Sequence, residues 1–161
     1  MHLEVPQVVS LHVSPTAAVA MTTRKRVTLV AGKGILGDRY YSARGTFSKK
    51  NGPDREVTLI EEEALLAAKR DYAVKLRGAM TRRNLVTRGV SLNHLVGQRF
   101  TVGDDVVLEG LRLCEPCGHL AKLLGSTRVR EALIHRGGLR ARIVQGGTVR
   151  VGDVVNAWTR V

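Results

Sequence analysis

Residues 99–113 read RFTVGDDVVLEGLRL, and this stretch has the pattern that decides the fold class. Apolar and β-branched residues alternate with polar residues on both sides of Gly103 and Asp104, which predicts two strands joined by a tight turn. Comparable strand-like runs occur at residues 8–13, 26–30, 56–60 and 84–87. Strands that recur at such short intervals, with turn residues between them and few long helices, favour a barrel or closed sheet.

The end of the chain adds the clearest predicted hairpin. Residues 139–158 read LRARIVQGGTVRVGDVVNAW, in which Ala141 and Ile143 alternate with arginines. Gly146 and Gly147 are suited to a tight turn, so the sequence predicts that the chain folds back on itself here.

Helical segments are few and short. EEEALLAAKR at residues 61–70 is rich in helix formers, with three glutamates in the first turn and Lys69 and Arg70 in the last. The helix dipole favours this arrangement, so the acidic cluster needs no catalytic role. Shorter helical segments are expected at SLNHLVG (91–97), CGHLAKLL (117–124) and EALI (131–134). The predicted fold class is mainly β with a few short helices (α+β).

Length and composition favour a single soluble domain. A chain of 161 residues, 43% of them hydrophobic, is the size of one domain and can fill a core. Its two cysteines cannot form a disulfide framework, and its first residues lack the basic and apolar regions of a signal peptide. No stretch has the roughly 18 apolar residues that a membrane span needs. We therefore expect a cytoplasmic protein that does not enter a membrane.

The net charge of +12 comes mainly from nineteen arginines. Arginine presents a rigid fork of donors that suits phosphate and other oxyanions, whereas lysine offers a point charge. A basic surface with weak, non-specific affinity for nucleic acid would explain the same composition. Only 4% of the residues are aromatic, and the interleaved aromatics on which single-stranded nucleic acid stacks are absent. A nucleic-acid partner is therefore not favoured.

The glycine-containing segment at residues 31–54 is long for a loop, and loops of this length are commonly functional or mobile. It matches neither the dinucleotide fingerprint nor the phosphate-binding loop of nucleotide hydrolases. Gly34 and Gly37 could make turns, or backbone amides there could form an anion-binding concavity to which Arg39 adds charge. Asp38 is expected to brace the neighbouring Arg39 rather than to act as a general acid.

Cys117, in the segment LCEPCGHL (113–120), is the best candidate for chemistry. It is expected at the start of a helix, where the positive end of the dipole favours the reactive thiolate. The alternatives are a small buried cysteine, a zinc site with Cys114 and His119, and a redox pair with Cys114. A structural zinc needs four ligands, commonly in two pairs, and a redox pair needs a βαβ setting. A single thiolate that binds a soft metal fits the segment better.

Five segments in order resemble the MOSC family, which is named from the C-terminal part of molybdenum-cofactor sulfurases. They are GILGDRY (34–40), REVTLIEEEAL (55–65), TRRNLVTRGVSLNHLVGQRF (81–100), VGDDVVLEGLRLCEPCGHL (102–120) and RGGLRARIVQGGTVRVGD (136–153). Each segment is weak alone, but five in order around one cysteine are specific. The resemblance implies a single MOSC domain over residues 1–161, with the motifs at about 27–158 and no sulfurase or ferredoxin domain.

The resemblance also implies a MOSC-type β-barrel with a pocket for the molybdenum cofactor, a pterin that carries a phosphate and a dithiolene-bound metal. Cys117 matches the cysteine that ligates molybdenum, or that carries sulfur in sulfurase relatives. Arg82 and Asn84 match the family's Arg-x-Asn, which would hold the phosphate or the pterin. Arg39 and Arg55 match basic or polar positions that line the same pocket.

Two features qualify this match. Cys114 occupies a position where cysteine is frequent but not essential, so its role is secondary. Amidoxime-reducing relatives have a Lys-Ser pair near the N-terminus, whereas this chain has neither Lys nor Arg before Arg24. One contact with the phosphate or pterin is therefore missing or is supplied from elsewhere.

The leading functional hypothesis is an oxidoreductase that uses the molybdenum cofactor to reduce N-hydroxylated substrates. Electrons would come from an external flavin or iron–sulfur partner, because the chain has too few cysteines for a cluster of its own. The alternative is a non-enzymatic carrier of cofactor or sulfur, with a persulfide on Cys117.

Overall fold

Eleven strands and two α-helices are found in the computed structural model, which describes residues 5–17, 19–41, 52–116, 122, 125 and 128–157. The strands are β1 (Gln7–Val13), β2 (Thr22–Arg24), β3 (Arg26–Val30), β4 (Gly34–Ile35), β5 (Val57–Glu61), β6 (Leu85–Arg88), β7 (Arg99–Val102), β8 (Val106–Leu113), β9 (Leu139–Gln145), β10 (Gly147–Arg150) and β11 (Val155–Asn156). The α-helices are α1 (Glu62–Tyr72) and α3 (Arg128–Ala132), and three short 3₁₀ helices are η1 (Pro53–Arg55), η2 (Gly78–Thr81) and η3 (Leu92–Leu95). The predicted fold class, mainly β with a few short helices, is confirmed.

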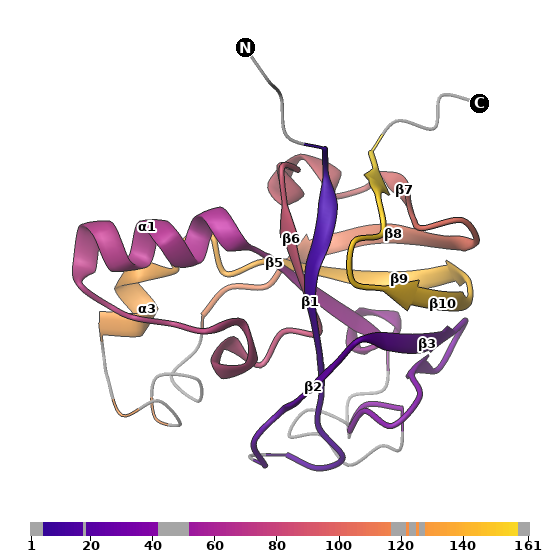
Figure 1. Cartoon of the computed structure of the whole chain (residues 1–161), viewed down its shortest axis with the longest axis horizontal. Helices are drawn as coiled ribbons and strands as arrows, with labels where there is room; N and C mark the ends of the chain where they lie inside the picture. Colours follow the sequence, from indigo (N-terminus) through magenta and orange to yellow (C-terminus); the bar gives the residue numbers. More distant parts are fainter. Residues whose placement is uncertain are drawn as a thin grey trace.

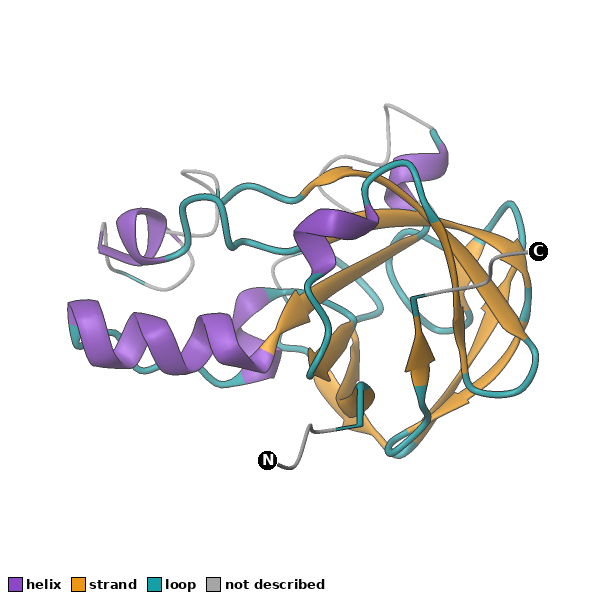
Figure 2. Ribbon diagram, turned by 90° about the horizontal axis from the view of Figure 1, so that it is seen from above, coloured by secondary structure: helices purple, strands orange, loops and turns teal. Residues whose placement is uncertain are grey.

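The strands form two sheets (Figure 1). The larger has the order β11-β7-β8-β9-β5-β6-β1-β2, and the smaller has the order β10-β3-β4. Only the β5–β6 pair is parallel among the strand pairs of the described residues. Figure 2 shows the strands curling around one side of the molecule, with α1 and α3 next to each other at the other side. None of the described helices has the length and apolar character needed to cross a membrane.

The larger sheet curls until the edge strand β11 and the residues before it meet the start of β1, next to the other edge strand β2, through backbone hydrogen bonds. The start of β1 lies beside the residues that lead into β11. Val8 N donates to Asp153 O at 2.9 Å, and Gly152 N donates to Val8 O at 2.8 Å. Val155 N donates to Pro6 O at 2.9 Å. Backbone groups that would otherwise form open sheet edges are therefore paired.

Alternation along the strands builds the core inside this curl. In β9, Leu139, Ala141 and Ile143 are buried, whereas Arg140 and Arg142 between them are partly exposed. The two sheets together bury the large side chains that fill the centre, which are Leu11, Leu29, Leu59, Leu85, Phe100 and Leu108. A second cluster, which includes Ile60, Ala68, Val129 and Leu133, joins α1 and α3 to the sheet.

The predicted hairpin at the end of the chain is wrong. Both strands form, but β10 pairs with β3, whereas β9 pairs with β5 and β8. A Cβ at Gly146 would lie 2.4 Å from Leu29 O, and Gly147 is the direct partner of Leu29. The two glycines therefore allow the chain to leave one sheet and pass close to the backbone of another, as strands do at sheet corners.

The other predicted elements differ from the observed ones by small shifts. The strands expected at 8–13, 26–30, 56–60, 84–87 and within 99–113 are confirmed. The helical turn within 91–97 is η3, and α3 covers the start of the segment 131–134. Of the helix expected at 117–124, all but residue 122 lies outside the described residues.

The glutamates at the start of α1 have structural partners, as predicted. Glu62 Oε2 accepts a hydrogen bond from Arg88 Nε at 2.6 Å, and Glu63 Oε2 accepts one from Gly89 N at 2.9 Å. The helix ends at Ala73, which adopts the left-handed conformation with φ 54°. An L-residue with a side chain is disfavoured in that conformation, which glycine adopts freely.

Ala73→Gly should increase the free energy of unfolding by about 1 kcal/mol, because glycine removes the steric cost of the left-handed residue. Urea denaturation followed by circular dichroism measures the effect. Lys69→Gly, at an exposed position within the same helix, is the control and should lower the free energy by about 1 kcal/mol. A loss of stability in Ala73→Gly would contradict the conformational explanation.

His12 should make stability depend on pH. Its imidazole is buried, with Nδ1 3.1 Å from Thr23 Oγ1 and Nε2 2.9 Å from Ser10 Oγ, and burial lowers its pKa. As the pH falls, His12 is protonated in the unfolded chain before it is protonated in the folded chain. The contribution of neutral His12 to the free energy of unfolding is therefore complete above about pH 6.5 and is lost as the pH falls below it. Urea denaturation at several pH values should show a smaller loss on acidification in His12→Gln than in the unmodified chain. An identical loss in both would exclude His12 as the cause.

Candidate functional site

The segment that leads into Cys117 is held at the end of β8. Cys117 and His119 lie outside the described residues, and the described segment ends at Pro116. Cys114 is buried, and its backbone N donates to Gly138 O at 2.7 Å. A Cβ at Gly137 would lie only 2.2 Å from Cys114 O, so the two backbone segments approach more closely than a side chain would permit.

Arg83 anchors this segment, and sequence reasoning did not select it. Its buried guanidinium donates to three carbonyl oxygens, Gly137 O at 2.8 Å, Thr81 O at 3.0 Å and Cys114 O at 3.3 Å. Buried polar groups need such partners, and here one side chain joins three segments that are far apart in the chain. The only sequence signal was its place between Arg82 and Asn84, which does not show which arginine points inward.

Arg39 follows the turn after β4 and is buried. Its Nη1 lies 3.3 Å from Asp38 Oδ1, and its Nη2 donates to Arg82 O at 3.2 Å. Asp38 Oδ1 also accepts a hydrogen bond from Ser14 N at 3.0 Å. The ring of Tyr40 lies 4.6 Å from the Arg39 guanidinium carbon. The prediction that Asp38 braces Arg39 is therefore confirmed.

Three backbone amides of the turn before Arg39 have partners within the fold. Lys33 N donates to Val30 O, Leu36 N to Thr28 O and Asp38 N to Ile35 O. Gly34 and Gly37 have φ values of 125° and 89°, which are turn conformations. The turns predicted at Gly34 and Gly37 are confirmed, and the anion-binding concavity stays a prediction.

Arg82 lies beside Arg39. It adopts the left-handed conformation with φ 64°, and its guanidinium donates to Val19 O. Burial, followed by the nearby positive charge of Arg39, lowers the pKa of Arg82. The structure therefore brings together two predicted arginines that are distant in sequence, with Asp38 as a partly compensating charge.

Asn84 is occupied by contacts within the fold. Its Oδ1 accepts hydrogen bonds from Thr58 N and Thr58 Oγ1, both at 3.1 Å, and its Nδ2 donates to His12 O at 3.1 Å. The side chain is buried and joins β1 and β5 to the start of β6. These contacts support a positioning role, since Asn84 orients the backbone next to Arg82 and Arg83.

Arg55 lies in a second cluster, around Asp54 of η1. Arg55 Nε is 3.9 Å from Asp54 Oδ1, and Arg112 Nη2 is 2.8 Å from Asp54 Oδ2. Arg140 Nη1 donates to Asp54 O at 3.4 Å. Asp54 is held ionised, since hydrogen bonding to Arg112 and the surrounding positive charges lower its pKa despite the opposing effect of desolvation. Within the described residues, no three His, Cys, Asp or Glu side chains form a group that could hold a metal ion.

The family model of the MOSC domain matches residues 47–156, more than half of the chain. Two solved structures share the fold along nearly all of this chain. The YuaD protein from Bacillus subtilis is 15% identical with a TM-score of 0.78, covering 97% of this chain and 98% of that one. YiiM from Geobacillus stearothermophilus is 16% identical with a TM-score of 0.73, covering 96% and 76%. No curated protein matches the sequence.

The match with the domain model, on a curled sheet that carries the expected motifs in order, defines the class of protein. The chain belongs to the MOSC family.

Arg83→Met should lower the free energy of unfolding by about 3 kcal/mol, because three buried carbonyl oxygens lose their donor. It should also expose Cys114, whose backbone Arg83 holds. Thiol labelling of Arg83→Met in a Cys117→Ser background, with urea denaturation, measures both effects.

Arg99→Met is the matched control, because the exposed pair of Arg99 with Glu109 should contribute less than about 1 kcal/mol. If Arg83→Met is no less stable than Arg99→Met and labels no faster, Arg83 is not the anchor of the segment.

Proposed function

We propose that this protein binds the molybdenum cofactor beside Arg39 and Arg82, with Cys117 as the metal ligand, and reduces N-hydroxylated compounds. The MOSC family is associated with binding of this cofactor. The observation that carries the proposal is the closeness of Arg39 to Arg82, since the Arg39 guanidinium donates to the backbone oxygen of Arg82 at 3.2 Å. Burial, and after it the positive charge of Arg39, lowers the pKa of Arg82. A phosphate bound between the two arginines would offset the repulsion between their positive charges.

The polar groups of the described site fit a phosphorylated pterin. Two arginines can bind the phosphate as forks of donors. Asp38 Oδ2 is buried and has no hydrogen-bond donor among the described residues. A buried carboxylate oxygen without a donor is costly, and the ring N–H groups of a pterin could donate to it. Asp38 would then hold Arg39 through one oxygen and the pterin through the other.

Cys117 is the thiol that suits a soft metal in this site. The other cysteine, Cys114, is only 1% exposed. The contacts of Arg83 and Gly138 with the backbone of Cys114 fix the strand end from which the Cys117 segment continues. The chain would therefore supply one thiolate for the metal and use Cys114 for packing.

The reaction needs a partner for electrons. When bound, the cofactor supplies a two-electron redox centre for cleavage of an N–O bond. Reduction of a hydroxylamine consumes two electrons and two protons and yields an amine and water. Two cysteines cannot form the four-cysteine ligand set of a common iron–sulfur cluster. An external flavin or iron–sulfur protein would therefore deliver the electrons.

Elemental analysis for molybdenum, tungsten and zinc tests the proposal on protein from a host that makes the cofactor. The unmodified protein and Cys114→Ala should contain nearly stoichiometric molybdenum, whereas Cys117→Ala and Arg39→Gln should lose it. Circular dichroism checks that each variant is folded. With a chemical electron donor, only the first two proteins should reduce a hydroxylated purine.

Three results would count against the proposal. Stoichiometric zinc would assign the cysteine segment to a structural metal. Molybdenum retained in Cys117→Ala would exclude Cys117 as the ligand. A persulfide on Cys117, found by mass spectrometry in a protein that turns over no hydroxylamine, would favour the sulfur carrier instead.

A further inference from the structure

Two arginines lie directly opposite each other on the outer side of the smaller sheet. Arg26 of β3 is the register partner of Arg150 of β10, and Thr28 is the partner of Thr148. The Cβ atoms of direct antiparallel partners are about 5 Å apart, and like charges in such pairs are destabilising. Sites where a chain departs from a local stability rule are commonly functional.

A hollow of about 490 Å³ lies over this pair. Arg24 of β2 joins Arg26 and Arg150 in its lining, together with the hydroxyl-bearing Thr28 and Thr148. No Asp or Glu is among the described residues that line it. Three positive charges and two hydroxyl groups therefore face one hollow, and no carboxylate of the described lining balances them.

These arginines differ from surface arginines that have acidic partners, such as Arg70, Arg99 and Arg112. Within the described part of the chain, the side chains of Arg24, Arg26 and Arg150 have no hydrogen bond or ion pair. The nearest carboxylate along the chain, Asp153, accepts the backbone N–H of Arg150 at 2.8 Å and does not line the hollow.

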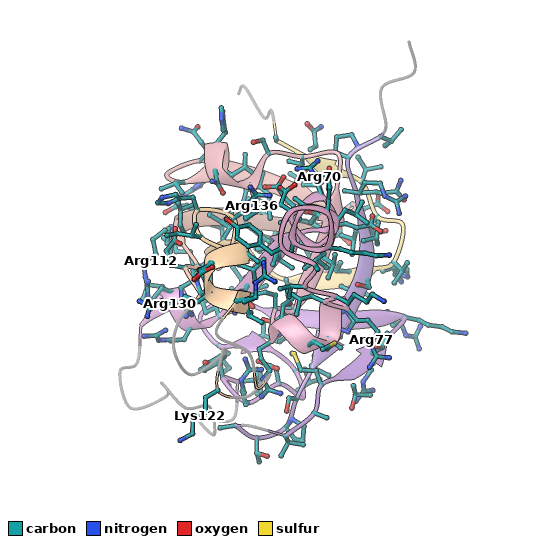
Figure 3. All side chains as sticks on the ribbon, turned by 90° about the vertical axis from the view of Figure 1, so that its left-hand side faces the viewer. Arg70, Arg77, Arg112, Lys122, Arg130 and Arg136 are labelled. Atoms are coloured by element: carbon teal, nitrogen blue, oxygen red, sulfur yellow. The ribbon has the colours of Figure 1, made fainter. Side chains whose placement is uncertain are left out.

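Two arginines of the basic face around α1 and α3 show the contrast, whereas Arg77, Arg130 and Arg136 on that face have no ion pair among the described residues (Figure 3). Arg70 Nε on that face lies 2.6 Å from Asp71 Oδ1, and Arg112 Nη2 lies 2.8 Å from Asp54 Oδ2. An arginine that already has an acidic partner gains less binding free energy from a further anion than an arginine without such a partner.

We propose that this hollow binds a small molecule with two or more phosphate groups, such as a nucleoside diphosphate. Guanidinium groups bind phosphate oxygens in pairs, and three of them match two phosphates better than one. The volume lies within the range of about 300–1,000 Å³ typical of small-ligand pockets. Single-stranded nucleic acid would need a longer groove with aromatic platforms, and no aromatic residue is found in the part of the lining that the structure describes.

The site is separate from the cysteine site and does not depend on the proposed function. Arg39, Arg82 and Cys114 do not line the hollow. Leu36 and Gly37 connect the two, since they belong to the turn that precedes Asp38. Val13 also lines the hollow and precedes Ser14, whose backbone N donates to Asp38 Oδ1. Loss of molybdenum and loss of phosphate binding can therefore be measured independently.

Isothermal titration with pyrophosphate and with ADP tests the site on the full-length protein. The double variant Arg26→Gln/Arg150→Gln removes the opposed pair. Arg128→Gln/Arg130→Gln removes the same charge from exposed positions of α3 and is the matched control. We expect the first variant to weaken binding by about tenfold or more and the control to change it by less than about twofold. Molybdenum content should be the same in both variants.

Four results would overturn the proposal. The first is no binding of pyrophosphate or ADP to the unmodified protein. The second is an equal loss in both double variants, which would show a general charge effect. The third is loss of molybdenum in Arg26→Gln/Arg150→Gln, which would assign these arginines to the cofactor. The fourth is duplex DNA affinity that depends on this pair while ADP does not bind.

Discussion

The buried guanidinium of Arg83 is the interaction on which the candidate site depends. It donates to carbonyl oxygens of residues 81, 114 and 137, so it joins the end of η2, the end of β8 and the segment before β9. A buried charge without a carboxylate partner persists only when dipoles such as these surround it. Because the contacts are to backbone atoms, they position segments rather than side chains. The chain that continues to Cys117 thus starts from a fixed point.

Arginine has three physical roles in this protein, and the net charge of +12 conceals them. Arg83 is buried and supports the backbone. Arg142 and Arg99 flank Glu109 across adjacent strands, which neutralises part of the outer face of the larger sheet. Arg26 and Arg150 oppose each other with no acidic partner among the described residues. Composition alone left both a diffuse basic surface and an oxyanion site open, whereas the structure separates supporting, neutralised and unpaired charges.

Strands were predictable here because alternation is a local property of the chain. Residues 99–113 form β7 and β8 as expected, since each apolar position must face the same core. Pairing is not local, and the predicted terminal hairpin was wrong for that reason. Gly146 and Gly147 permit a tight turn and equally permit passage into another sheet. The chain passes into another sheet because β10 pairs with β3 and β9 pairs with β5, and both partners lie far earlier in the sequence.

The sequence by itself determined the mainly β fold class and the family, since the alternation of apolar and polar residues and the order of the motifs are properties of the linear chain. It also selected Cys117, Arg39 and Arg82 as candidates, through their places in those motifs. Only the tertiary structure showed that Arg39 contacts Arg82, that the Asn84 amide is occupied by Thr58 and His12, and that Arg83 is the anchor. Such contacts join residues many positions apart. They depend on sheet order, which long-range packing decides and which neighbouring residues do not encode.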